Sequence, residues 1–138
     1  MAHLIEFSVW SNLDKYLNLE LVLLKGHLML EVILEDKLSS LSSLDTKAIQ
    51  NLSFFKKLCL LELKVKKEGD CQKASIQFAK ELNAIRNRLA HELFFEDCAA
   101  ELSNWSSRVL LILPSTKMQR YTARTSLTQA IAAVAKAI

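Results

Sequence analysis

The sequence predicts an all-α fold, a single-domain antiparallel bundle of four to five helices across residues 1–138. Glycine and proline are scarce, with two and one in 138 residues, so the chain lacks the tight turns that a β-sandwich or barrel needs roughly every ten residues. Apolar residues make up 51% of the chain and recur at helical intervals of three and four. This apolar content, combined with balanced charge, excludes a disordered chain.

The first helix is expected at residues 12–38, because its apolar residues step by three and four. Further apolar residues on the flanks indicate burial on more than one side. Gly26 interrupts this helix at a cost of about 1 kcal/mol relative to Ala. Close packing of another helix against Gly26 is the interpretation we favour. The alternative places His27 near a functional cleft, with Glu31 one turn later as its orienting partner.

The later helices follow from capping residues and breaks. The serine-rich stretch 39–45 is expected to be a linker, with Asp45 or Thr46 as the N-cap of a helix that ends near Lys67. Gly69 is the type of residue expected at the C-cap of that helix, and Pro114 ends a later one. The remaining helices are expected at residues 71–98, 100–113 and 116–138.

The net charge of +3 is unevenly distributed along the chain. After Glu101 there are five basic residues and no acidic one, which leaves 13 basic and 15 acidic residues, a net charge of −2, for residues 1–101. The C-terminal third could therefore meet an anionic partner, or it could be an ordinary charged surface. The five basic residues are Arg108, Lys117, Arg120, Arg124 and Lys136.

Cysteine usage and hydropathy indicate the cellular compartment of the protein and the kinds of site it can contain. Cys59, Cys71 and Cys98 are an odd number without CxxC or metal-ligand spacing, so we expect neither a disulfide framework nor a zinc site. This usage is typical of a reducing cytoplasm. No apolar run approaches the roughly 18 residues that span a bilayer, and no glycine-rich phosphate loop is present. We expect a cytoplasmic protein with no metal, no cofactor and no membrane contact.

One face of the helix predicted at 71–98 has an unusual composition. Helical geometry at about 100° per residue centres the core stripe near Leu89 and sets this face opposite it, towards solvent. A plain solvated face would be dominated by Lys and Glu, so its composition indicates contact with a partner molecule. Arg86 and Arg88 lie on the flanks, from which their long side chains reach either surface. The face itself carries Lys80, Asn83, Asn87, His91 and Phe94.

Residues 86–91 combine groups that suit chemistry at a phosphate. His91 has a side chain whose ordinary pKa lies near neutrality, which suits proton transfer. Guanidinium groups match a phosphate and the charge that develops on it in a transition state. Asn87 could orient the His91 ring or hold a phosphate oxygen. Such a set could deprotonate a ribose 2′-hydroxyl and stabilise the phosphorane without a metal. The plainer interpretation is that these side chains only pair with the acidic residues that follow.

The segment Arg86-Asn87-Arg88-Leu89-Ala90-His91, preceded by Leu82-Asn83-Ala84-Ile85, resembles the signature of HEPN domains. That signature is an Arg followed after four to six residues by His, with a polar residue, commonly Asn, just after the Arg. The resemblance extends over about residues 10 to 135. It implies a helical bundle that dimerises so that two copies of the motif face one cleft. It also implies a metal-independent endoribonuclease of a toxin–antitoxin, phage-defence or RNA-processing system, with 2′,3′-cyclic phosphate product ends.

The resemblance also implies roles for individual residues. Arg86 would contact the scissile phosphate, His91 would act as acid or base, and Asn87 would support them. We expect the neighbouring Lys80, Asn83 and Arg88 to bind the substrate. The chain departs from HEPN toxins that pair with nucleotidyltransferase antitoxins, because these often carry a Tyr where this chain has Leu93.

A non-catalytic function is the alternative. A mannitol-operon repressor family carries a similar Arg-Asn…Ala-His stretch, so the chain could be a helical dimer that acts as a transcriptional regulator or a partner-binding module. In that case His91 could be lost without loss of function. The expected partners are a second copy of the chain, an RNA substrate, and a cognate antitoxin or other protein.

Overall fold

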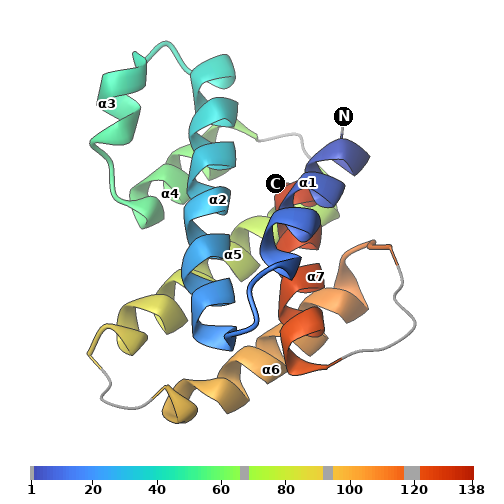
Figure 1. Cartoon of the computed structure of the whole chain (residues 1–138). Helices are drawn as coiled ribbons and strands as arrows, with labels where there is room; N and C mark the ends of the chain where they lie inside the picture. Colours follow the sequence, from blue (N-terminus) through green and yellow to red (C-terminus); the bar gives the residue numbers. More distant parts are fainter. Residues whose placement is uncertain (1, 66–68, 92–94, 117–121) are drawn as a thin grey trace.

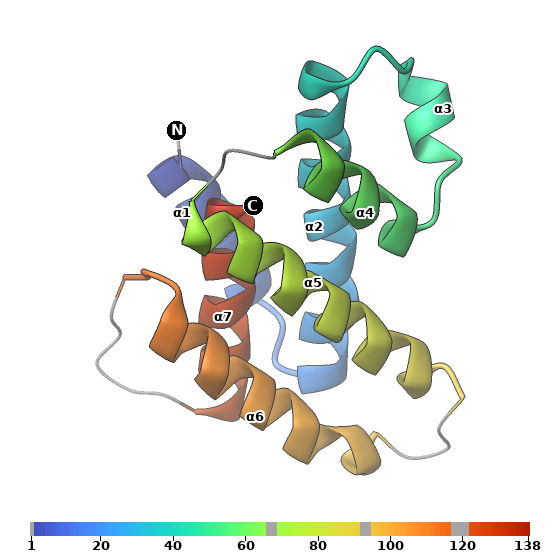
Figure 2. The same ribbon diagram turned by 180° about the vertical axis from the view of Figure 1, so that it is seen from behind.

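The computed structural model describes residues 2–65, 69–91, 95–116 and 122–138, which form seven helices and no strand (Figures 1 and 2). The predicted all-α, single-domain fold is confirmed. The predicted count of four to five helices is too low, because two of the expected helices are each divided into two. The helices are α1 (Ala2–Asp14), α2 (Leu19–Leu41), α3 (Thr46–Gln50), α4 (Phe54–Lys64), α5 (Asp70–Leu89), α6 (Glu96–Ile112) and α7 (Ala123–Ala137).

The helix expected at 12–38 is in fact the end of α1 followed by α2. The chain breaks the helix at residues 15–18, and α2 restarts where the side chain of Asn18 accepts a hydrogen bond from the Leu21 N–H. The apolar spacing concealed this break, because Leu17 keeps the helical step although it is 86% exposed in the connection. An Asn at the N-cap does not disturb the spacing of the apolar residues around it, so periodicity alone does not reveal that a new helix starts there.

The helix expected to end near Lys67 is also two helices. Of the two predicted N-cap candidates, Asp45 is the N-cap of α3, and its carboxylate accepts from the Ala48 N–H at 2.7 Å. Ser53 then caps a separate α4. Gly69 precedes α5 at its N-cap and not at a C-cap, with a φ of −69° that any residue adopts. Residues 66–68 lie outside the described ranges.

The helix expected at 71–98 ends earlier, at Leu89. Helix α6 begins at Glu96, before the expected residue 100, and α7 begins at Ala123, after the expected residue 116. Neither Gly nor Pro occurs between residues 86 and 98, so the sequence carries no breaker at the turn after α5.

Helix α7 is the centre of the molecule, and α1, α2, α5 and α6 pack around it (Figures 1 and 2). Its residues 130–135 are buried on every side. A Cβ atom on Gly26 of α2 would lie 2.5 Å from Cδ1 of Ile131. The favoured explanation of Gly26 is therefore confirmed: the glycine lets α2 and α7 approach closely.

Three of the five basic residues after Glu101 are paired with acidic residues. The three that the structure describes form ion pairs with acidic residues of α1 and α5, so they do not make an unpaired basic surface. Lys117 and Arg120 lie outside the described ranges. The pairs are Arg108–Glu81 at 2.7 Å, Arg124–Asp14 at 3.1 Å and Lys136–Glu6 at 2.7 Å. No helix within the described ranges is long and apolar enough to cross a membrane.

Candidate functional site

The residues of the HEPN-like motif lie at the C-terminal end of α5. Arg86 and Arg88 occupy the last turn of the helix, where positive charge interacts favourably with the helix dipole. His91 follows in the turn beyond Ala90, and its backbone N–H donates to the Arg88 carbonyl at 2.9 Å. The motif therefore spans the point where the helix stops.

Arg86, Asn87 and His91 all lie at this end of α5, and Arg86 contacts Asn87. Asn87 and His91 are exposed, as helical geometry predicted, and Arg86 is half-buried. The Arg86 Nη1 donates to the Asn87 Oδ1 at 3.3 Å. Among the residues that the structure describes, no carboxylate pairs with Arg86 or His91. A guanidinium, an amide and an imidazole are thus available together to a ligand.

Asn83 lies on the buried side of α5, so its predicted place on the exposed face is wrong. Only 8% of its surface is exposed, and its Oδ1 accepts a hydrogen bond from Nε2 of His27 at 3.0 Å. The polar side chain can be buried because α2 supplies this partner. Since the oxygen only accepts, the bond requires the His27 tautomer that carries its proton on Nε2.

His27 is the buried histidine of the site. Its ring packs on Phe54 of α4 with centroids 4.2 Å apart. Burial lowers the pKa of His27 below its ordinary value of 6.5, the Asn83 hydrogen bond opposes this, and the nearby charge of Arg86 lowers the pKa further. His27 is therefore a neutral hydrogen-bond donor at pH 7. The alternative explanation of His27 named Glu31 as its orienting partner, but the residue bonded to its ring is Asn83 of α5.

A buried lysine beside His27 was not predicted from the sequence. Lys57 of α4 is 1% exposed, and its Nζ lies 2.7 Å from Glu35 and 3.5 Å from Glu31, both on α2. Its charge also lowers the pKa of His27. The available signal was its position three residues after Phe54 and one before Leu58, which places it on the apolar stripe of α4.

Two residues predicted to bind substrate are held by carboxylates. Lys80 pairs with Glu62 of α4 at 2.7 Å. Both terminal nitrogens of Arg88 donate to Glu101 of α6, and these hydrogen bonds lower the pKa of the Glu101 carboxyl. The structure therefore directs Arg88 towards α6, while Arg86 keeps no acidic partner in the described ranges.

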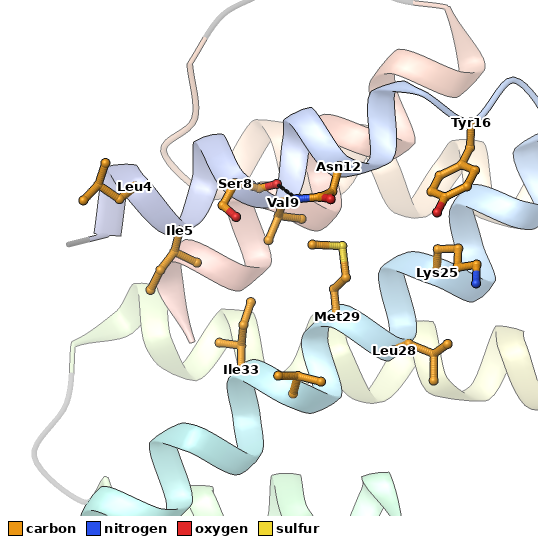
Figure 3. A pocket seen from close by; sticks show the side chains of 11 residues that line it. Leu4, Ile5, Ser8, Val9, Asn12, Tyr16, Lys25, Leu28, Met29 and Ile33 are labelled. Atoms are coloured by element: carbon orange, nitrogen blue, oxygen red, sulfur yellow. Dashed lines mark hydrogen bonds between the residues drawn. The ribbon is translucent and has the colours of Figure 1, made fainter.

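Two hollows of the surface lie differently with respect to the motif: one borders it at Arg88 and the other lies away from it. A depression of about 490 Å³ between α5 and α6 is bordered by the ion pairs Arg88–Glu101 and Arg108–Glu81. The second hollow, about 600 Å³, is an apolar groove between α1 and α2 that contains no motif residue (Figure 3).

Two points bear on the chemistry available to the site. Within the described ranges there is no group of three or more His, Cys, Asp or Glu side chains that could hold a metal ion. Leu93 and Phe94, which were named above from the sequence, lie outside those ranges.

Searches of protein-family models, curated proteins and solved structures found no match to this chain.

Proposed function

We propose that this protein is a HEPN-like, metal-independent endoribonuclease that works as a homodimer. The observation that carries the proposal is the set Arg86, Asn87 and His91 at the solvent-facing end of α5. These side chains have no acidic partner in the described ranges, although most other cations of the helix bundle near them are ion-paired. A structural role for the motif would be expected to leave its guanidinium paired.

In the proposed reaction, His91 removes the proton of a ribose 2′-hydroxyl. The 2′-oxygen then attacks the adjacent phosphorus and forms a phosphorane. Arg86 stabilises the charge on its non-bridging oxygens. The bond to the 5′-oxygen breaks, and the protonated His91 of the second copy supplies a proton to this leaving oxygen. The products are a 2′,3′-cyclic phosphate and a 5′-hydroxyl.

The surroundings of the three residues support these roles. Half-burial limits the freedom of Arg86, so less entropy is lost when its planar fork binds a phosphate. Asn87 accepts from Arg86 and can donate its amide hydrogens to a phosphate oxygen. His91, exposed beyond the helix end, can approach a 2′-hydroxyl without displacing a neighbouring side chain.

A second candidate function is a non-catalytic dimer that binds a regulatory partner. The apolar groove between α1 and α2 favours it, because a groove of about 600 Å³ can receive a protein segment without any chemistry at the motif. A transcriptional regulator or antitoxin-binding module would use such a surface. This function predicts that His91→Ala leaves binding and regulation intact.

The test is RNA cleavage in excess EDTA by the wild type, His91→Ala and Arg86→Ala, with product ends identified. We expect the wild type to leave 2′,3′-cyclic phosphates and each variant to lose at least about 100-fold in rate. His3→Ala is the matched control, because it removes an exposed histidine of α1. Wild-type protein that cleaves none of several structured and single-stranded RNAs would overturn the proposal and favour the regulator.

A further inference from the structure

The groove between α1 and α2 is lined mainly by apolar side chains, several of which remain exposed. Leu4 of α1 and Leu28 and Val32 of α2 border it and are 68%, 53% and 59% exposed. Its volume of about 600 Å³ lies within the range of about 300–1,000 Å³ that is usual for small-molecule sites, which are mostly apolar and contain a few polar groups. The groove therefore has the size and the lining of a site for a small apolar ligand.

The two ends of this groove differ in chemistry. Tyr16 and Lys25 lie together at one end, and Ile33 lies at the other with the first apolar residues of α1 (Figure 3). Between the ends, the Asn12 amide is used within α1, where it donates to the Ser8 carbonyl at 2.9 Å. Lys25 is the one charged residue among the eleven described residues that line the groove. A ligand that matches this lining carries a polar head at one end and an apolar tail.

The head group that fits the polar end is an anion. Neither Lys25 nor Lys15 forms an ion pair within the described ranges, and the Lys15 Nζ lies 5.4 Å from the centre of the Tyr16 ring. The Lys25 ammonium and the Tyr16 hydroxyl can both donate to a carboxylate, and Lys15 adds positive charge beside them. Asp36, exposed one turn beyond Val32, repels a carboxylate from the apolar end.

We propose that this groove binds a medium-chain fatty acid, with its carboxylate at Tyr16 and Lys25 and its alkyl chain between α1 and α2. The eight residues from Lys25 to Ile33 span about 12 Å of helix, about the length of an extended chain of ten carbon atoms. A partner helix is the less suitable occupant, because it carries charged residues along both flanks of its apolar face. The groove has its one charged lining residue at one end.

The fatty-acid site does not depend on ribonuclease activity, so it stands or falls separately from the proposed function. His27 of α2 carries the hydrogen bond to Asn83 of α5. Helical geometry turns His27 about 200° from Lys25, so a ligand in the groove lies on the opposite side of α2 from this bond. The motif end of α5 stays accessible when the groove is filled.

Isothermal titration calorimetry with decanoate, kept below its micelle concentration, tests the proposal. We expect the wild type to bind one decanoate per chain. Lys25→Met removes the charge and keeps an unbranched apolar stem, so it should weaken decanoate binding about fivefold. Decanol has the same chain length without the charge and should bind the wild type and Lys25→Met equally. Octanoate, which is two methylenes shorter, should bind the wild type at least about fourfold more weakly than decanoate.

Two further variants locate the ligand. Leu28→Glu places an acid in the middle of the groove at an exposed position, so it should weaken the binding of decanoate and decanol at least about tenfold while its circular dichroism matches the wild type. Lys73→Met, the same substitution as Lys25→Met at an exposed site of α5, should bind decanoate like the wild type. A wild type without saturable binding, as expected if a protein segment is the occupant, would overturn the proposal. Equal decanoate affinity in Lys25→Met, or unchanged binding in Leu28→Glu, would also overturn it.

Discussion

The middle of α5 and its C-terminal end carry similar polar side chains in different surroundings. In the middle, Lys80 is paired with Glu62, Glu81 with Arg108, and Asn83 with His27. At the end, Asn87 and His91 face solvent. Helices α2, α4 and α6 supply the partners in the middle. A polar residue on a helix thus takes its role from what packs opposite it, and residue type alone does not decide that role.

Arg86 and Arg88 show the same contrast over two positions. Helical geometry turns them about 200° apart, so Arg88 meets Glu101 of α6 while Arg86 lies near His27 of α2. One guanidinium is neutralised by a carboxylate, and the other keeps its charge beside a neutral imidazole. The comparison therefore separates a structural arginine from a candidate phosphate ligand.

The largest expected effect on stability comes from Lys57, the buried cation of α4. Lys57→Ala should lower the free energy of unfolding by about 2–3 kcal/mol, because it leaves Glu31 and Glu35 unneutralised and removes a packed stem. Urea titration would measure the loss. Lys56→Ala, an exposed neighbour, should change stability by less than about 0.5 kcal/mol. Equal effects at positions 56 and 57 would contradict the burial of Lys57.

Two asparagines one helical turn apart, Asn83 and Asn87, test the comparison between the middle and the end of α5. Asn83→Ala should cost about 1–3 kcal/mol in unfolding free energy, because the buried Nε2–H of His27 loses its acceptor. Asn87→Ala, on the exposed side, should cost less than about 0.5 kcal/mol. A double-mutant cycle with His27→Ala should show that the effects at positions 27 and 83 are coupled. Additive losses would show that the hydrogen bond does not stabilise the fold.

The pH dependence of stability should report on His27. Its folded pKa is lowered by burial below the ordinary 6.5, so below that pH the unfolded chain takes up a proton that the folded chain does not. The stability that His27 contributes is complete above pH 6.5 and is lost as the pH falls towards the lowered pKa. His27→Gln should therefore lose less stability than the wild type between about pH 7 and pH 5. Identical slopes would contradict the neutral, buried imidazole.

The smallest expected effect on stability comes from the exposed ion pair Arg88–Glu101 at the end of α5. Glu101→Ala should lower the Tm by no more than about 2 °C, because both side chains are exposed and solvent screens them. The difference from the wild type should vanish in high salt. Calorimetry at low and high ionic strength would show it, and a large salt-independent loss would mean that the pair does more than orient Arg88.

Local sequence signals predicted part of this architecture well. The scarcity of Gly and Pro and the helical spacing predicted the fold class. A helix was correctly expected to start at Asp45 or Thr46, and Gly26 was correctly expected to allow close packing. The ends of α1 at Asp14 and of α5 at Leu89 were missed because no Gly or Pro follows either of them closely. Apolar spacing continues across such breaks, so periodicity cannot detect them.

The candidate site was predicted where it depends on a single helix and missed where it depends on distant partners. The exposure of Asn87 follows from helical geometry, whereas His91 is exposed because it lies beyond the end of the helix. The burial of Asn83 depends on His27, which lies 56 residues away in sequence. No pattern within α5 indicates this partner. Arg88 and Lys80 likewise meet carboxylates on neighbouring helices, so their pairing required the tertiary structure.

The most direct test of the account compares Arg86→Ala with Arg88→Ala in RNA cleavage under excess EDTA, at concentrations where both variants are folded. The two substitutions remove the same group two residues apart, one without an acidic partner in the described ranges and one bound to Glu101. We predict a loss of at least about 100-fold for Arg86→Ala and of less than about tenfold for Arg88→Ala. Equal losses, or a larger loss for Arg88→Ala, would contradict it.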